Sequence, residues 1–221
     1  MKIRKYPIIY HSSYNIPLPE RHRFPGTKYS LLLRHLEDIG LTQNFLKYTP
    51  KPCTAENLSI AHKASYIEEI QAGILSRENQ TRLGLPWSEI LRQRSFIAPN
   101  GTLLAAQLAL QTGIACHAAG GTHHAHWDFG AGFCVFNDLA YAARALIKMR
   151  LARRVLILDC DVHQGDGTAN ILSNDSNILT CSIHCAENYP VKKAVSDLDF
   201  PISKGSGDDD YLAVLGRCLN Q

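Results

Sequence analysis

The stretch Val155 to Gly167, which reads VLILDCDVHQGDG, decides the fold of this 221-residue chain. An apolar run leads directly into Asp159, Asp161 and His163, which are spaced two residues apart. Because alternate side chains of an extended strand share a face, we expect these three to point the same way. Open α/β sheets place their sites at the carboxyl ends of buried strands, and a glycine-rich turn follows here. The stretch therefore predicts a metal site.

The composition is that of one globular domain spanning residues 1–221. Hydrophobic residues make up 45% and charged residues 19%, and the length is sufficient for one substantial core. The net charge of +3 is too small to indicate an anionic partner, so we expect no direct nucleic acid binding. No apolar segment approaches the roughly 20 residues of a membrane span, and none resembles a signal peptide. We therefore expect a cytoplasmic protein without a membrane partner.

The seven cysteines form an odd set that contains no CxxC pair. Their positions among apolar residues predict reduced, buried thiols, as in a cytosolic protein, and not a disulfide framework. Cys181 and Cys185 have a spacing that metal ligands can share, but we favour core positions for both. The sequence carries no indication of oligomeric state.

Helical and strand-like patterns alternate from residue 103 to residue 184, which predicts a parallel, helix-covered sheet. Strands are expected at 7–11, 58–60, 114–119, 154–159, 178–183 and 195–201. Helices are expected at 29–39, 65–72, 103–111, 137–149, 168–172 and 208–221, and a loop is expected at 81–88.

A second glycine-rich loop, Gly-Gly-Thr-His-His, ends in His123 and His124 and also follows a predicted strand. Loops that follow parallel strands gather at one sheet edge, so this loop and the stretch Val155 to Gly167 should share a crevice. Catalytic zinc takes histidine nitrogen and carboxylate oxygen and keeps one position for water. Asp161 and His163 are therefore the candidate ligand pair.

The two histidines of the second loop are candidates for acid–base chemistry. A neutral histidine beside the water can take its proton, provided that a carboxylate fixes its tautomer. Asp159 and Asp166 are the carboxylates within reach of His123 and His124. Other histidines are interpreted as structural or surface residues: His11, His22, His35, His62 and His117. His184 ends a strand and either lines the site or packs beside it.

Three segments resemble the successive signatures of the histone deacetylase family, which includes acetylpolyamine amidohydrolases. They are GGTHH (120–124), GFCVFND (132–138) and DCDVHQGDG (159–167). The segments YHSSY, HRFP, SDLD and GSGD are most similar to the short bacterial, class IV-like branch. The resemblance implies an arginase/deacetylase-like α/β fold, with a parallel sheet flanked by helices on both faces. It also implies a hydrolase, a zinc-dependent deacetylase of acylated lysine or of an acetylated small amine.

The resemblance also implies a role for each matching residue. Zn2+ would be held by Asp161 and His163. The water-activating pair would be His123 and His124, oriented by Asp159 and Asp166. The substrate tunnel would be lined by Gly132 and Phe133, with Arg23 near the acetate exit. A structural K+ or Na+ would be bound by Asp159, Asp161, His163, Ser182 and Ile183.

One departure from the family concerns its third zinc ligand, an aspartate, and its Gly-Gly-Tyr tyrosine. No Gly-Gly-Tyr occurs here, and Tyr189, Tyr211, Asp197 and Asp199 are poor substitutes. The resemblance thus implies a carboxyl-terminally truncated deacetylase. Two hypotheses stay open, a zinc-dependent deacylase and a catalytically silent remnant that binds a partner. An arginase-type manganese hydrolase is disfavoured, because this strand offers too few bridging aspartates.

Overall fold

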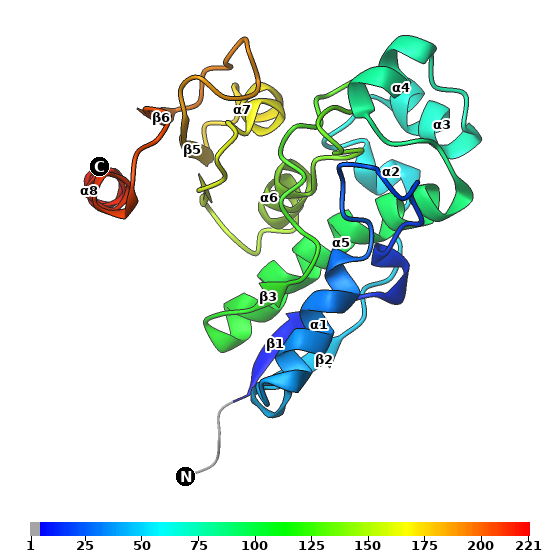
Figure 1. Cartoon of the computed structure of the whole chain (residues 1–221), viewed down its shortest axis with the longest axis horizontal. Coiled ribbons are helices and arrows are strands. Elements are labelled where there is room, and N and C mark those ends of the chain that lie inside the picture. The colour runs from blue at the N-terminus through cyan, green and yellow to red at the C-terminus, as the bar shows by residue number, and fades with distance from the viewer. Residues whose placement is uncertain (1–4) are drawn as a thin grey trace.

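The computed structural model describes residues 5–221, and its strands form two parallel sheets (Figure 1). The first sheet has the order β2-β1-β3 and the second has the order β4-β5-β6. Their bounds are Tyr6–Ile9 (β1), Phe45–Tyr48 (β2), Cys116–His117 (β3), Val155–Asp159 (β4), Ile178–Cys185 (β5) and Leu198–Ile202 (β6). The expected parallel arrangement is present, but in the described residues it is divided between two sheets.

Helices surround these sheets. Their bounds are Lys28–Asp38 (α1), Ala55–Leu58 (α2), Ala64–Ala72 (α3), Arg77–Leu83 (α4), Glu89–Thr112 (α5), Asp138–Lys148 (α6), Asp166–Leu172 (α7) and Asp208–Leu219 (α8). Two short 3-10 turns lie at Ser12–Tyr14 and Thr42–Asn44. None of the helices in residues 5–221 is long and apolar enough to cross a membrane.

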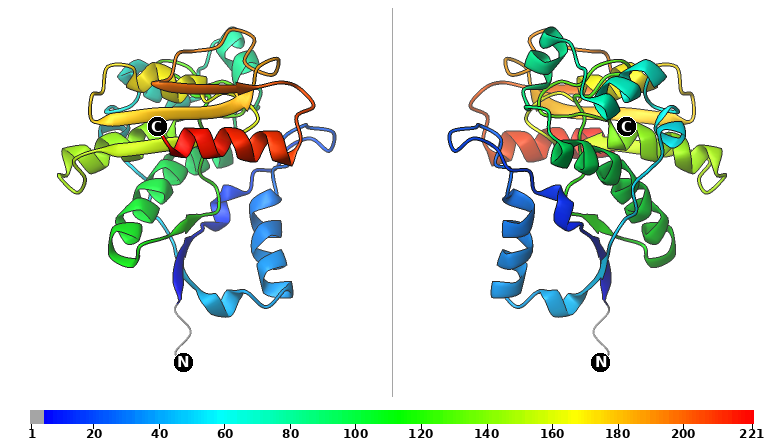
Figure 2. Two further views of the ribbon diagram at one scale, coloured as in Figure 1. Left: turned by 90° about the vertical axis from the view of Figure 1, so that its left-hand side faces the viewer. Right: turned by 90° about the vertical axis from the view of Figure 1, so that its right-hand side faces the viewer.

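The second sheet is covered on both faces because its central strand, β5, alternates its side chains between them. Ile178 packs into the main core with α6 and α7, whereas Cys181 and Ile183 pack against Val214 and Cys218 of α8. Figure 2 shows α8, in red, running alongside this sheet. The helix-flanked parallel sheet predicted from the alternation is therefore present.

The main core lies between the long helix α5, helix α6 and the segment around α3. Asn137 caps α6 by accepting a hydrogen bond from the backbone of Ala140 at 2.9 Å, which places the start of this helix where the sequence predicts it. Gly113 ends α5 in the left-handed conformation, also as expected.

Several local predictions are wrong, and helix caps explain three of them. Residues 58–60 belong to the end of α2 and the turn after it, because Thr54 and Asn57 form a capping box before them. Ser76 caps α4, which covers the first part of the expected loop 81–88. Ser88 caps α5, which therefore begins well before residue 103 and contains Pro99.

Two further predictions about the interior need correction. The strand expected at 114–119 is only the two residues of β3, because Cys116 and His117 alone pair with β1. The side chain of Ile114 is exposed. Five of the seven cysteines are buried, but Cys116 and Cys160 are exposed.

Candidate active site

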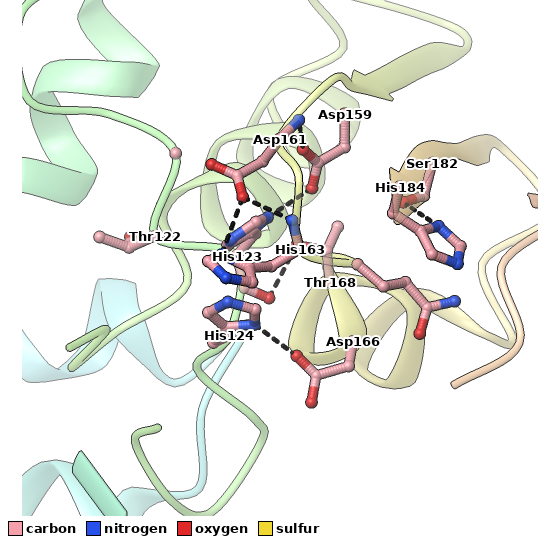
Figure 3. Close-up of polar contacts among 12 residues, drawn as sticks. Thr122, His123, His124, Asp159, Asp161, His163, Asp166, Thr168, Ser182 and His184 are labelled. Atoms are coloured by element: carbon pink, nitrogen blue, oxygen red, sulfur yellow. Dashed lines mark hydrogen bonds and ion pairs between the residues drawn. The ribbon is translucent and has the colours of Figure 1, made fainter. Parts of the chain in front are cut away.

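Two imidazole–carboxylate pairs lie side by side at the carboxyl end of β4 (Figure 3). Nδ1 of His123 lies 2.5 Å from Oδ2 of Asp159, and Nδ1 of His124 lies 2.7 Å from Oδ1 of Asp166. Both histidines are buried, and their ring centroids are 4.1 Å apart. Each carboxylate accepts a hydrogen bond from Nδ1–H, which leaves Nε2 of each ring free for the pocket.

The loop that carries His123 and His124, residues 120–124, is anchored by the buried carboxylate of Asp138, the first residue of α6. It accepts hydrogen bonds from the backbone of Gly121 at 3.0 Å and of Thr122 at 2.7 Å. It also accepts one from Oγ1 of Thr122 at 2.6 Å. The loop conformation before His123 is therefore set by α6.

Asn137, the residue before Asp138, contacts the same loop at and beyond the first histidine. Its buried Nδ2 lies 3.3 Å from the carbonyl oxygen of His123 and 3.1 Å from that of Ala125. It also lies 3.0 Å from Oγ1 of Thr168 in α7. The backbone N–H of Asn137 donates to Nε2 of His62 at 2.8 Å. The side chain of Asp138 thus binds the loop before the two site histidines, and the side chain of Asn137 binds the backbone of His123 and Ala125.

Asp161 and His163 lie beyond β4, in the turn that leads to α7. Oδ1 of Asp161 lies 3.2 Å from Nδ1 of His163 and accepts the backbone N–H of the same residue at 2.8 Å. Two zinc ligands at about 2.0 Å from a tetrahedral ion would be separated by about 3.3 Å, so this spacing fits two ligand positions. Their side chains are 50% and 38% exposed.

No group of three or more His, Cys, Asp and Glu side chains in residues 5–221 is placed to hold a metal ion. Asp197, a poor substitute for the third zinc ligand, instead accepts hydrogen bonds from the backbone N–H and the hydroxyl of Thr180 at 2.7 and 2.8 Å. Asp199 accepts from Nε2 of Gln164 at 2.9 Å. The donor set that this part of the chain offers a metal is therefore one carboxylate and one imidazole.

A pocket of about 620 Å³ opens over these groups. Its walls include seven of the residues that the sequence assigned to the site: Arg23, His123, His124, Gly132, Phe133, Asp161 and His163. Asp159 and Asp166, which hold the two histidines, are not among its lining residues. Ser182, Ile183 and His184 are not among its lining residues. Nδ1 of His184 lies 3.0 Å from Oγ of Ser182, so its side chain packs beside the sheet.

One wall is formed by backbone that presses against His124. Gly132 and Phe133 have φ values of +54° and +67°. A Cβ atom at position 132 would lie 2.5 Å from Cδ2 of His124. Glycine is therefore required at this position by both the close approach and the left-handed conformation.

Three residues near the site had no role assigned to them from the sequence: His126 and Arg94 were not singled out, and Tyr189 was considered only as a poor substitute for the family tyrosine. Nε2 of His126 lies 3.1 Å from Oδ2 of Asp166, so this carboxylate binds two imidazoles. The ring of Tyr189 stands edge-on to His124, with centroids 4.8 Å apart. Arg94 lines the pocket from the amino-terminal part of α5, where it donates to the hydroxyl of Tyr29. In the sequence, the position of His126, two residues after His124, was the one feature that could have indicated a role for it.

The electrostatics of the two histidines differ. Burial alone would lower the pKa of His123, but the hydrogen bond to Asp159 and its charge outweigh this and raise it. For His124, burial prevails and the pKa is lowered, helped by the neighbouring His123. Burial would raise the pKa of Asp166, but hydrogen bonds from His124 and His126 lower it to about 2. One ring of the pair thus favours the charged form and the other the neutral form.

The parallel sheets, the flanking helices and the pocket at the end of β4 place this chain in the class of arginase/deacetylase-like α/β proteins. The chain belongs to the histone deacetylase family, because the model of the histone deacetylase domain matches residues 22–221. In fold it is similar to an HDAC homologue from Aquifex aeolicus, with a TM-score of 0.79 and 22% identity. That match covers 98% of this chain and 64% of the other.

Curated relatives agree with this assignment. An uncharacterized protein of Picosynechococcus sp. is 45% identical over 97% of this chain and 71% of its own length. Histone deacetylase 2 of Arabidopsis thaliana is 27% identical over 98% of this chain and 59% of its own length. The acetoin utilization protein AcuC of Staphylococcus aureus is 31% identical over 75% of this chain. The chain thus spans between 45% and 71% of the length of these three relatives.

Proposed function

We propose that this chain carries the acid–base half of a zinc-dependent deacylase. Its substrate would be an N-acetyl or other N-acyl lysine, or a related acylated amine. The observation that carries the proposal is the pair of imidazole–carboxylate contacts, His123–Asp159 and His124–Asp166, in the same pocket as the Asp161–His163 pair. Membership of the histone deacetylase family supports it.

Asp161 and His163 would hold the metal, because their Oδ1–Nδ1 separation of 3.2 Å suits two ligands of one ion. When bound, zinc supplies a Lewis acid that polarises an acyl carbonyl and makes water acidic. A structural K+ or Na+ bound by Asp159, Asp161, His163, Ser182 and Ile183 remains part of the same proposal.

The two histidines would divide the proton transfers between them. His124, whose lowered pKa keeps its ring neutral, has a nitrogen available to accept a proton of the attacking water. His123, whose raised pKa beside Asp159 keeps its ring protonated to higher pH, has a proton to give to the departing amine. Environments that push the proton affinities of neighbouring groups apart are the usual way in which one site obtains both an acid and a base.

The walls of the pocket suit a substrate with an extended apolar stem. The ring of Phe133 and the backbone of Gly132 form one side, and the ring of Tyr189 lies at the same pocket. Arg23, also in the lining, would attract the carboxylate of the released acid. An apolar channel with polar groups at its base is the arrangement expected for a methylene chain that ends in an amide.

The test is turnover of an acetyl-lysine peptide together with zinc stoichiometry. We expect zinc-dependent release of acetate, and we expect His123→Ala to abolish it while zinc binding persists. His35→Ala, which changes an exposed histidine of α1, is the matched control. Turnover that is equal in wild type and His123→Ala would overturn the proposal.

A second function is favoured by one observation. Residues 5–221 provide two donors for a metal and no third, whereas catalytic zinc sites use three protein ligands. In this alternative the chain binds acyl-lysine or a protein partner without hydrolysing it. Saturable binding of an acetyl-lysine peptide with no acetate release in excess zinc would favour the binding module over the enzyme.

A further inference from the structure

A pair of cysteines lies away from the pocket, where helix α8 packs on strand β5. The sulfur of Cys181, in β5, lies 3.0 Å from the sulfur of Cys218, in the last turn of α8. Both side chains are buried, in a small cluster with Ile183 and Val214. Their sulfurs need to approach by only about 1 Å to reach the bond length of a disulfide.

This contact distinguishes the pair from the other cysteines, all of which lie within residues 5–221. The buried thiols of Cys53 and Cys134 hydrogen-bond instead to backbone carbonyl oxygens, of Phe96 at 2.8 Å and of Gly132 at 3.5 Å. The thiol of Cys185 faces Glu187 at 3.6 Å. Cys181 and Cys218 are therefore the one pair in the described chain with their sulfurs in contact.

We propose that Cys181 and Cys218 form a reversible dithiol–disulfide site that fastens helix α8 to the sheet. The co-reactant is a small disulfide of the glutathione type. One thiol loses its proton and attacks the small disulfide, which forms a mixed disulfide and releases one small thiol. The second thiol then attacks the mixed disulfide and releases the other. Two S–H groups are oxidised to one S–S bond, and one small disulfide is reduced to two thiols.

Helix α8 is suited to such control because one small apolar cluster and few polar contacts hold it. Its buried residues are Val214 and Cys218, Tyr211 and Leu215 pack partly against the same cluster, and the Tyr211 hydroxyl hydrogen-bonds to Cys160. No ion pair joins α8 to the rest of residues 5–221. An element with few buried contacts opens locally at low cost in free energy.

The same opening explains how a buried pair can react. Burial, together with the contact to Cys218, raises the pKa of Cys181 to about 12, so the closed site is protonated and slow to react. Transient opening of α8 exposes both thiols to the small disulfide. Reclosure brings the sulfurs back into contact, which favours the bond between them over two separate glutathione adducts.

The experiment is to incubate the reduced protein with oxidised glutathione, block free thiols, and digest with trypsin without reduction. Cleavage after Arg217 releases the tetrapeptide Cys218 to Gln221, and we expect this peptide disulfide-linked to residues 155–192. Oxidation should also raise Tm by on the order of 10 °C, because the closed loop is long. Reduction with dithiothreitol should reverse both changes.

Matched variants identify the partner of Cys218, because residues 155–192 also contain Cys160 and Cys185. We expect the link to persist in Cys160→Ser and in Cys185→Ser, and to disappear in Cys181→Ser. Glutathione adducts without a linked peptide in the wild-type protein would overturn the proposal. A link that survives Cys181→Ser would overturn it as well. Neither result depends on deacylase activity.

Discussion

Nε2 of His126 lies 3.1 Å from Oδ2 of Asp166, so a single carboxylate holds two imidazoles. The other oxygen of Asp166 binds Nδ1 of His124 at 2.7 Å. The ring of His126 is stacked on Phe129, with centroids 4.4 Å apart. His126 thus fixes the orientation of the carboxylate that orients His124.

Loss of the His126 contact should weaken catalysis without weakening substrate binding. We expect His126→Phe, which keeps a ring to stack on Phe129, to lower kcat by about 10- to 100-fold at a similar KM. His126→Gln, which retains a donor, should recover part of the loss. Steady-state kinetics on an acetyl-lysine peptide measure this, and equal kcat values for His126→Phe and wild type would contradict it.

Asp159→Asn should remove the charge that stabilises protonated His123 and should no longer fix its tautomer. We expect kcat to fall by about 1,000- to 10,000-fold, by analogy with the loss of the carboxylate from a catalytic triad. We also expect the pKa of His123, followed by NMR, to fall. Asp128→Asn, at an exposed site, is the control. An unchanged pKa of His123 would refute the argument.

Gly132→Ala should damage the site and the fold together. The new methyl group would lie 2.5 Å from the ring of His124, and the backbone there has φ of +54°. We expect a loss of about 1–3 kcal/mol in the free energy of unfolding, with displacement of His124 and loss of activity. Gly216→Ala is the control, because nothing lies within 4 Å of a Cβ there. Urea denaturation compares the two.

Asn137→Ala should loosen the loop that carries the histidine pair. The change removes a buried side chain that binds two loop carbonyl oxygens and the hydroxyl of Thr168, and it removes the cap of α6. We expect a destabilisation of about 2–4 kcal/mol. Faster amide hydrogen exchange at residues 121–126 would show that the loop is affected. Unchanged exchange there would contradict the role of Asn137 in holding the loop.

The stability of the protein should fall as the pH drops from about 6.5 to about 4. Burial lowers the pKa of His62 to about 4 and outweighs the hydrogen bond from its Nδ1 to the carbonyl oxygen of His126, which acts to raise the pKa. In this window the unfolded chain binds more protons than the native chain, so stability rises with pH and is lost toward acid. The contribution is about 3 kcal/mol.

The corresponding measurement is the free energy of unfolding in urea at several pH values. His62→Gln should show a shallower pH dependence between 4 and 6.5 than the wild-type chain. His35→Gln, at an exposed position of α1, should leave the slope unchanged. Identical slopes in His62→Gln and wild type would show that another group is responsible.

Local patterns were sufficient for the elements that surround the site. Alternation of apolar residues and the capping residue Asn137 predicted β4, β5 and α6 to within about two residues, since these signals act between near neighbours in the chain. The start of α5 was missed because Ser88, a cap far upstream, outweighs the helix-breaking tendency of Pro99.

The sequence by itself determined the parallel α/β class from its alternating patterns and the family from its resemblance to known signatures. It also predicted a set of site residues, because ligand-type side chains follow strands whose ends must meet at one sheet edge. Only the tertiary structure decided that Asp166 is shared between His124 and His126, and that the sulfurs of Cys181 and Cys218 touch. These contacts join residues distant in the chain, and their partners are chosen by packing between elements, which no local pattern records. The structure also decided that His184 turns toward Ser182, its near neighbour in β5.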